Sequence, residues 1–395
     1  MPRSQASNGV CRSDFIKPFI SVLLWLGFIT LVPSIARAGP QGLSAEQMKL
    51  VQGLITDIMA QEHAPGATFA IGRDGRIIWA EGFGFSDIEN HVPATAATVY
   101  RTASIGKPMT ATAAMELWEE GKLDLDAPIQ KYCPRFPKKR WTITTRDLLS
   151  HTSGIREPNE TSELYNTRHY DRVSDALAIF GRDPLKMRPG SDFLYTTWGY
   201  VVLGCVLEGA AREEYRALMK RMIFDPAGMT STRDDDPRAI IADRARGYIY
   251  EGGGPKNSGW ADMSSKLPAG GWVTTATDLV RFMMAWMDGQ YVSAETQALM
   301  LTPYRLPRHG GTVDGFGLGW FLEDYHGLRA GFHGGGTPQV SGIAFFVPGK
   351  RIAIAGIFNV QDISGAKRVT LAKAIIDAVL GPEPAGAHSV HLARR

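Results

Sequence analysis

Signals for strands and helices divide this chain into three consecutive blocks, and this division limits its possible folds more than any single motif does. Residues 41–121 and 261–382 contain short apolar runs separated by Gly, Pro and Asp, together with helical segments. Residues 122–260 carry helical patterns and loops without a run of alternating strands. We therefore predict an α/β body built from both ends of the chain, with a mainly helical insertion between its halves. A ligand site is expected in the cleft between the two parts.

The first block begins with a helix and a hairpin. Residues 44–62 have the apolar periodicity of a helix, which Pro65 and Gly66 interrupt. Residues 67–71 and 76–80 are two apolar runs around a Gly/Asp turn, which is typical of a β-hairpin.

The last block contains further strands between helices. Residues 317–322, 341–347 and 351–357 are predicted strands, and residues 370–380 form a final apolar helix. Thr277 is expected to cap the helix that precedes these strands.

The net charge of the chain is concentrated at its N-terminus. Of 395 residues, 44% are apolar and 21% are charged, which is the composition of an ordinary globular protein. The formal net charge of +3 is already reached within the first 38 residues, so the remainder is close to neutral. A neutral body offers no electrostatic attraction to nucleic acid or to an anionic membrane, and we expect neither as a partner.

The first 38 residues have the pattern of a secretory signal peptide. Basic residues up to Lys17 precede an apolar run over residues 19–32, which Pro33 ends. Ala36 and Ala38 supply the small side chains that a signal peptidase reads, so cleavage is predicted after Ala38. The alternative is an uncleaved membrane anchor, but the run is shorter than the roughly 20 residues that a span requires. We expect a periplasmic or secreted protein without a stable membrane span after cleavage.

Two cysteines remain after removal of the signal peptide, which takes Cys11 with it. An exported protein could pair Cys133 with Cys205. However, Cys205 lies in an apolar run, where a cysteine is usually a small buried hydrophobic residue, and this interpretation is favoured over a disulfide. The sequence contains no set of residues with metal-ligand spacing, so we expect neither a metal nor another cofactor.

Ser104 and Lys107 are the first candidates for chemistry. They lie one helical turn apart at the start of a helical run, so the hydroxyl and the amine can point into the same space. Pro108 is tolerated in a first turn, which places the hydroxyl near the positive end of the helix dipole. An amine with a lowered pKa can take the proton of a serine and make it a nucleophile. The alternative is a serine that only caps the helix, since Ser-x-x-Lys alone is a weak signal.

Further motifs accompany this pair along the chain. They lie at residues 101–107, 121–128, 148–155, 189–195, 223–229, 268–271 and 333–335. In this order, the seven motifs resemble the serine β-lactamase-like hydrolases of the class C type. This family includes class C β-lactamases, D-alanyl-D-alanine carboxypeptidases, D-aminopeptidases and esterases. The resemblance covers about residues 45–382.

The resemblance implies an α+β fold of the β-lactamase/transpeptidase type. Its sheet is mainly antiparallel and flanked by helices, and a mainly helical subdomain is inserted. Residues 39–382 would form this single domain, with residues 122–260 as the helical part. Residues 383–395, which are rich in Ala and end in basic side chains, are expected to form a flexible tail.

The resemblance also implies roles for individual residues. Ser104 matches the nucleophile, Lys107 the lysine that helps to deprotonate it, and Tyr195 the tyrosine that relays the proton to the leaving group. Residues 333–335 match the strand motif whose sequence in β-lactamases is Lys-Thr-Gly. The backbone N–H groups of Ser104 and Gly336 would form the oxyanion hole, where fixed donors stabilise developing charge.

Three aromatic side chains among these motifs have structural alternatives. Tyr195 could be a core residue with a satisfied hydroxyl, and His333 could be a packing residue, but their places in the motifs favour a role in the site. His151 lies in the motif at residues 148–155, and we predict that it fixes a loop through a hydrogen bond.

The chain departs from the family pattern at two positions. Thr197 stands where an asparagine is usual, and its shorter side chain weakens the expected contact with a substrate amide. His333 stands where β-lactamases have lysine, and Gly334 where they have threonine. A histidine with an ordinary pKa near 6.5 is mostly neutral at neutral pH, so weak recognition of carboxylates is predicted. Gly335 follows in the same substrate-binding strand motif.

These observations together predict an exported serine hydrolase that cleaves carboxylic esters, small amides or peptides through an acyl-enzyme on Ser104. The alternative within enzymes is a β-lactamase or D-alanyl-D-alanine carboxypeptidase. An alternative of another class is a non-catalytic ligand-binding relative that keeps the pocket. The oligomeric state stays open.

Overall fold

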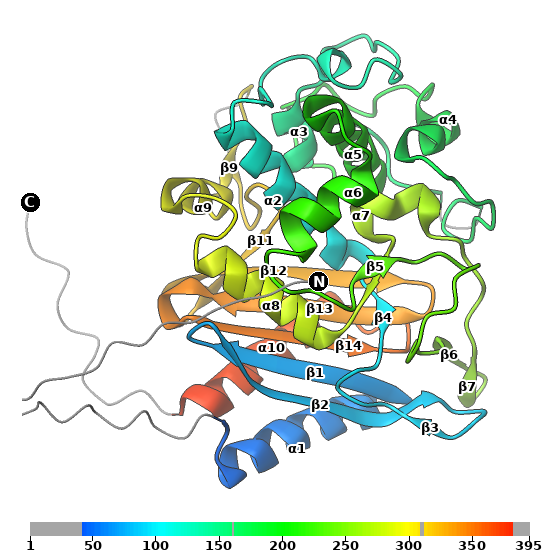
Figure 1. Cartoon of the computed structure of the whole chain (residues 1–395), viewed down its shortest axis with the longest axis vertical. Helices are drawn as coiled ribbons and strands as arrows, with labels where there is room; N and C mark the ends of the chain where they lie inside the picture. Colours follow the sequence, from blue (N-terminus) through cyan, green and yellow to red (C-terminus); the bar gives the residue numbers. More distant parts are fainter. Residues whose placement is uncertain (1–41, 160–161, 309–311, 382–395) are drawn as a thin grey trace, which may run out of the picture. The chain divides into compact units, whose positions relative to one another are not determined.

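A seven-stranded antiparallel sheet forms the centre of the computed structural model, which describes residues 42–159, 162–308 and 312–381 (Figure 1). The strand order is β11-β12-β13-β14-β1-β2-β3. The strands are β1 (Gly66–Arg73), β2 (Arg76–Asp87), β3 (Val92–Pro93), β11 (Phe321–Tyr325), β12 (Leu328–Thr337), β13 (Val340–Val347) and β14 (Ile352–Phe358). β1 pairs with β14, so the first and last blocks of the sequence share one sheet, as predicted.

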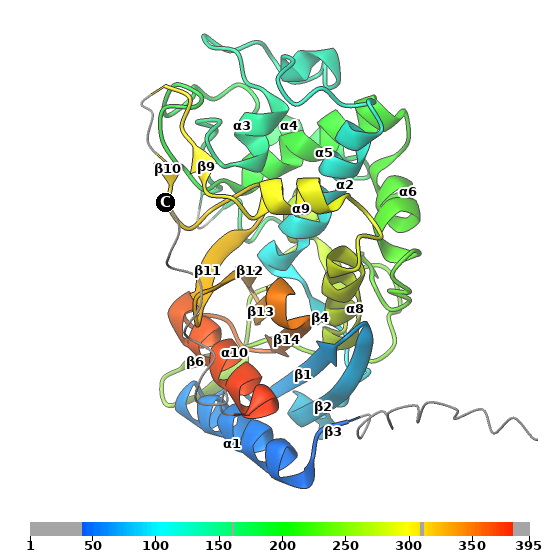
Figure 2. The same ribbon diagram turned by 90° about the vertical axis from the view of Figure 1, so that its left-hand side faces the viewer.

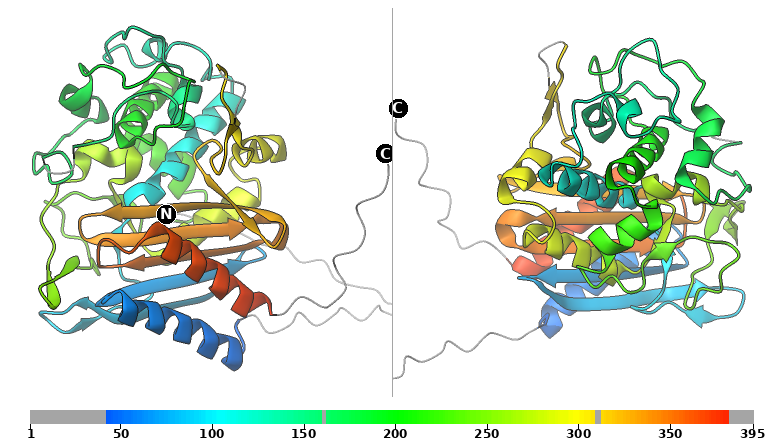
Figure 3. Two further views of the ribbon diagram at one scale, coloured as in Figure 1. Left: turned by 180° about the vertical axis from the view of Figure 1, so that it is seen from behind. Right: turned by 45° about the horizontal axis from the view of Figure 1, so that its top comes forward.

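Helices cover both faces of this sheet. α1 (Ala45–Gln61) and α10 (Gly365–Leu380) lie side by side on one face (Figures 2 and 3). α8 (Ala276–Met287) packs against β1 and β14 on the other face. Thr275, not Thr277, caps α8, because its side chain accepts the N–H of Asp278.

The helical part lies above the sheet in Figure 1 and is centred on two buried helices, α2 (Gly106–Glu119) from the first block and α5 (Thr197–Ala211) from residues 122–260. Shorter helices surround them: α3 (Thr145–Leu149), α4 (Leu177–Phe180), α6 (Tyr215–Met219), α7 (Leu267–Gly270) and α9 (Ala294–Met300). Small strands also occur: β4 (Tyr100–Arg101), β5 (Arg233–Asp234), β6 (Tyr248–Glu251), β7 (Gly254–Asn257), β8 (Trp272–Thr274), β9 (Tyr304–Arg305) and β10 (Thr312–Val313). The hairpin of β6 and β7 was not predicted, because its residues are largely polar and exposed rather than apolar.

Cys133 and Cys205 form a disulfide bond, so the prediction that they stay unpaired was wrong. Cys205 is buried, as expected, but the turn that carries Cys133 packs directly against α5 and brings the two Cα atoms to 5.5 Å. Gly209 permits this approach, because a Cβ at that position would lie 1.8 Å from the carbonyl oxygen of Tyr132. Contact between segments 72 residues apart decided the pairing, and the local apolar pattern does not reveal such contact.

The predicted signal peptide (residues 1–38) and the predicted C-terminal tail (residues 383–395) lie outside the described residues. Within the described residues, the longest apolar helices fall short of what crossing a membrane would require.

Candidate active site

The backbone before Ser104 holds this side chain at the start of α2. Ala103 has φ 45°, in the left-handed region that residues with a Cβ rarely adopt. Gly270 lies directly against it, and a Cβ there would meet the Ala103 carbonyl oxygen at 1.7 Å. Such backbone strain persists only where the surroundings impose it, and it is common at active sites. Ser104 does not cap the helix: its hydroxyl bonds to Lys107 instead.

The Lys107 side chain is completely buried, and its amine faces the nucleophile. Nζ lies 2.9 Å from Ser104 Oγ and 3.4 Å from both Thr197 Oγ1 and the carbonyl oxygen of Ala269. Burial lowers the pKa of Lys107 to about 8, although the carboxylate of Glu157 acts in the opposite direction. At pH 7, about one tenth of this amine is therefore unprotonated and able to accept a proton, far more than for a lysine with an ordinary pKa.

Tyr195 completes a compact group with Ser104 and Lys107. Its side chain lines the same cavity as Ser104, and Lys107 Nζ lies 4.7 Å from the centre of its ring. Burial raises the pKa of the Tyr195 hydroxyl, and the nearby Ser104 side chain opposes this effect. The phenol therefore keeps its proton at neutral pH and is available as a donor.

His151 packs against the ring of Tyr195. Its ring lies 4.3 Å from the Tyr195 ring, and its Nδ1 accepts the backbone N–H of Thr196. Burial lowers the pKa of His151 well below its ordinary value, so the ring is neutral. The prediction of a loop-fixing hydrogen bond is confirmed by this contact.

β12 passes directly beside the nucleophile because its glycines carry no side chains. A Cβ on Gly335 would lie 2.6 Å from the carbonyl oxygen of Thr102. Gly336 lines the same cavity as Ser104. The guanidinium of Arg368 on α10 donates to the carbonyl oxygens of Gly335 and Gly342 and so ties β12 and β13 to the helix. No sequence signal pointed to Arg368, because its role depends on contacts across the sheet.

His333 is a buried, neutral residue of this strand. Its Nδ1 donates to the Gly334 carbonyl oxygen at 2.7 Å, and its Nε2 has no hydrogen-bond partner among the described residues. Burial and the positive charge of Lys107 lower the pKa of His333 to about 3. The residue therefore brings no positive charge to the site, in contrast to the lysine that it replaces.

Thr197 and Glu157 form a second polar group beside Lys107. The hydroxyl of Thr197 donates to Glu157 Oε1 at 2.8 Å, and its backbone N–H donates to Glu157 Oε2. Thr197 thus joins an exposed carboxylate to the buried amine. Sequence reasoning missed Glu157, although it follows the motif at residues 148–155 by only two positions.

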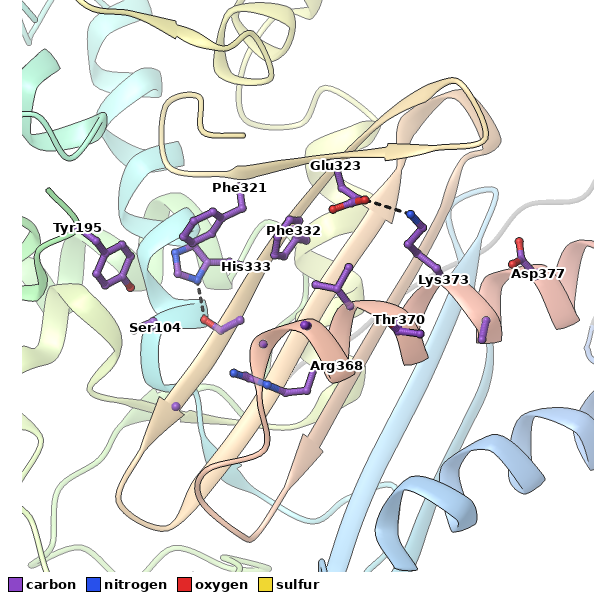
Figure 4. A pocket seen from close by; sticks show the side chains of 16 residues that line it. Ser104, Tyr195, Phe321, Glu323, Phe332, His333, Arg368, Thr370, Lys373 and Asp377 are labelled. Atoms are coloured by element: carbon purple, nitrogen blue, oxygen red, sulfur yellow. Dashed lines mark hydrogen bonds and ion pairs between the residues drawn. The ribbon is translucent and has the colours of Figure 1, made fainter. Parts of the chain in front are cut away.

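Ser104 and Tyr195 lie at one end of an elongated cavity of about 950 Å³ (Figure 4). His333 and Phe321 adjoin them, and the cavity continues along α10 to Asp377. Within the described residues, no group of His, Cys, Asp and Glu side chains is arranged to hold a metal ion.

Comparison with known proteins places this geometry in a family. The family model described as Beta-lactamase matches residues 51–378, a range that contains every side chain of the site. The chain belongs to the beta-lactamase family. Family members of the serine β-lactamase-like type are hydrolases, and the resemblance that the seven motifs indicated is confirmed.

Relatives of this beta-lactamase family member occur in mammals and in bacteria. The human serine beta-lactamase-like protein LACTB, mitochondrial, is 31% identical in an alignment of 343 residues, and the match covers 66% of this chain and 62% of LACTB. This chain thus spans less than two thirds of the length of that relative.

Solved structures confirm the fold. The octameric penicillin-binding protein homologue from Pyrococcus abyssi matches with a TM-score of 0.71 and 28% identity, over 84% of this chain and 77% of that one. The D-amino acid amidase from Ochrobactrum anthropi SV3 shares the fold at 23% identity, with a TM-score of 0.73 over 85% of this chain and 99% of that one. The predicted α+β fold with an antiparallel sheet flanked by helices is therefore correct.

Proposed function

We propose that this protein is an exported serine hydrolase that cleaves esters or small amides through an acyl-enzyme on Ser104. The observation that carries the proposal is one partly exposed hydroxyl that accepts a hydrogen bond from a buried amine and shares its cavity with a phenol beside that amine. Membership of a hydrolase family supports the same chemistry.

In the first half of the proposed reaction, Ser104 Oγ attacks the substrate carbonyl carbon and passes its proton to Lys107 Nζ. The N–H groups of Ser104 and Gly336 hold the resulting oxyanion. When the bond to the leaving group breaks, the Tyr195 hydroxyl gives its proton to that group and is reprotonated from Lys107. The products of this half are a free alcohol or amine and an ester on Ser104.

Water completes the reaction. It gives a proton to the same amine–phenol pair while its oxygen attacks the acyl carbon. The acid leaves, and Ser104 Oγ regains a proton as the ester bond breaks. The protonation state at the end is that of the start, so no further reactant is required.

The test is covalent labelling of the nucleophile. Intact-protein mass spectrometry after treatment with a fluorophosphonate should show one adduct, which peptide mapping places on Ser104. Ser104→Ala should lose both the adduct and the turnover of p-nitrophenyl acetate, while Ser150→Ala, a buried serine of the same subdomain, should keep both. Saturable ligand binding without an adduct would instead indicate a non-catalytic relative.

β-Lactamase or carboxypeptidase activity is a second candidate, favoured by the likeness to a penicillin-binding protein homologue. The neutral His333 argues against it, because a β-lactam or a terminal D-alanine presents a carboxylate that a lysine would attract. Nitrocefin hydrolysis that is faster than ester hydrolysis would make β-lactamase activity the first candidate.

Export is supported by the disulfide between Cys133 and Cys205, since such bonds persist in oxidising compartments. The basic and apolar pattern of the first 38 residues supports it as well. N-terminal sequencing of the protein from its native host should begin at Gly39; a chain that begins at Met1 in the membrane fraction would contradict the proposal.

A further inference from the structure

The cavity that contains Ser104 is much longer than the chemistry at Ser104 requires. From Ser104 and Tyr195 it runs between α10 and the face of β11 and β12, as far as Lys373 and Asp377 (Figure 4). Its volume of about 950 Å³ lies at the upper end of the range for ligand pockets. The part beyond Ser104 has no role in the steps proposed above.

We propose that this groove between α10 and β11–β12 binds an unbranched apolar chain on the leaving group, so that the preferred substrates are esters of long-chain alcohols. This inference rests on the proposed function and names the substrate class of the same site.

The walls of the groove are apolar where the alkyl chain of the substrate would lie. Phe321 and Phe332 form one wall, and their rings are stacked with centres 5.4 Å apart. Val369 and Ala374 of α10 form the opposite wall. Such side chains offer contact area to methylene groups and no hydrogen bonds to a polar ligand.

The charged groups at the groove are already paired with the protein. Lys373 Nζ binds Glu323 at 3.0 Å, and Asp377 accepts the hydroxyl of Tyr325 at 2.6 Å. The Arg368 guanidinium donates to backbone carbonyl groups of the sheet. Because these charges have partners, the groove gains little from a charged ligand, and the Glu323–Lys373 pair lies in its far half, before Asp377 (Figure 4).

We assign the groove to the leaving group, because the proposed proton donor to that group lines the groove. Tyr195, the proposed proton donor to that group, lines the cavity, and so does His333. Thr197 and Glu157, on the other side of Lys107, do not line it. In this assignment, the portion of the substrate that receives the phenol proton extends toward α10.

The length of the groove limits the length of the alkyl chain that the substrate alcohol can have. It follows α10 from Gly365 to Asp377, and at 1.5 Å per residue this distance is about 18 Å. Alcohols of medium to long chain length can use this distance, whereas methanol and ethanol leave it empty.

Two matched ester series test the inference with the full mature protein. Methyl, butyl, octyl and dodecyl acetate vary only the alcohol, and ethyl acetate, butyrate and octanoate vary only the acyl group. Release of acid is measured by pH-stat. We expect kcat/KM to rise about twofold per methylene in the alcohol series, half of the full transfer effect, because the groove is open to solvent on one side. A rise confined to the acyl series, or no rise in either, would overturn the inference.

A narrowed groove provides the second test. In Val369→Trp, the ratio of kcat/KM for octyl acetate to that for methyl acetate should fall at least tenfold. Ala374→Phe should give the same result if Val369→Trp is unstable. Lys367→Trp is the matched control, because Lys367 lies on the same helix outside the groove and pairs with Glu62. A ratio that is unchanged in both groove variants contradicts the inference.

These tests separate failure of the inference from failure of the proposed function. If Ser104 forms an adduct with the fluorophosphonate but neither groove variant changes the chain-length dependence, the substrate class is wrong and the hydrolase mechanism stands. If no adduct forms and no ester is cleaved, the proposed function itself is rejected.

Discussion

At the scale of single residues, the site depends on an amine whose charge is controlled by its surroundings. Lys107 is buried against Ser104, and its pKa of about 8 is the balance of burial, which lowers it, and Glu157, which raises it. The unprotonated amine is the form that can accept the serine proton. We therefore expect kcat/KM to increase with pH through about 8 and then to level off. Lys107→Met should lower kcat by about a thousandfold, the effect typical of a lost general base.

Glu157→Gln tests the electrostatic link between these two residues. Removal of the carboxylate removes the influence that raises the pKa of Lys107, so the rising part of the pH–rate profile should move to lower pH. The amide can still accept from Thr197, which keeps the local geometry. Glu251→Gln is the control, because it neutralises an exposed carboxylate that pairs with Lys256 in the hairpin of β6 and β7. A profile that stays in place, or moves to higher pH, would contradict the link.

At the scale of secondary-structure elements, α10 acts on the site through β12. Arg368 donates to the carbonyl oxygens of Gly335 and Gly342 and holds β12 beside Ser104. In Arg368→Met, both carbonyl groups lose this donor, and the N–H of Gly336 is expected to shift away from the oxyanion. We predict that the rate of acylation by a fluorophosphonate falls about ten- to a hundredfold.

Lys367→Met, one residue earlier on the same helix, should acylate at the normal rate. Partial recovery is expected in Arg368→Lys, which keeps a donor. If Arg368→Met lowers the melting temperature and acylates normally, Arg368 serves only the stability of the fold and does not position β12.

Elements with strong local signals were predictable, and those defined by contact were not. The helix predicted at residues 44–62 is α1, whose capping box joins Ser44 and Gln47, and the predicted hairpin is β1–β2. The predicted final helix began too late, because Ser364 caps α10 six residues earlier. The strand predicted at residues 317–322 was also misplaced, because β11 begins only at Phe321.

The candidate site shows the same division. The order of motifs indicated Ser104, Lys107, Tyr195 and His333. In the structure, Ser104, Tyr195 and His333 line one cavity, and Lys107 contacts Ser104. Glu157 meets Thr197 across 40 residues of sequence, and Arg368 meets Gly335 across 33. Neither contact leaves a pattern in the sequence, because each depends on how distant segments pack.

At the scale of the whole molecule, the disulfide constrains the unfolded chain. Cys133 and Cys205 are 72 residues apart, and closing a loop of this length stabilises the folded state by about 4 kcal/mol in the chain-entropy treatment. The variant with both Cys133→Ala and Cys205→Ala should lose stability of this order. Urea unfolding of the two proteins, followed by circular dichroism, measures the difference.

Added reductant provides the control for this prediction. It should lower the urea midpoint of the unmodified protein and leave that of the double variant unchanged. Equal midpoints for the oxidised and reduced protein would show that the bond does not form in solution or does not contribute.

The pairing of β1 with β14 has a consequence for how the protein is made. On one side, residues 67–73 pair with the adjacent strand β2, but on the other side they can pair only after residues 352–358 have left the ribosome. Pairing across such a separation is slow, since the loop must close before the contact stabilises it. A nascent chain of this kind has no complete sheet into which it could lock prematurely. For the export proposed above, this delay would keep the sheet incomplete until β14 has been synthesised.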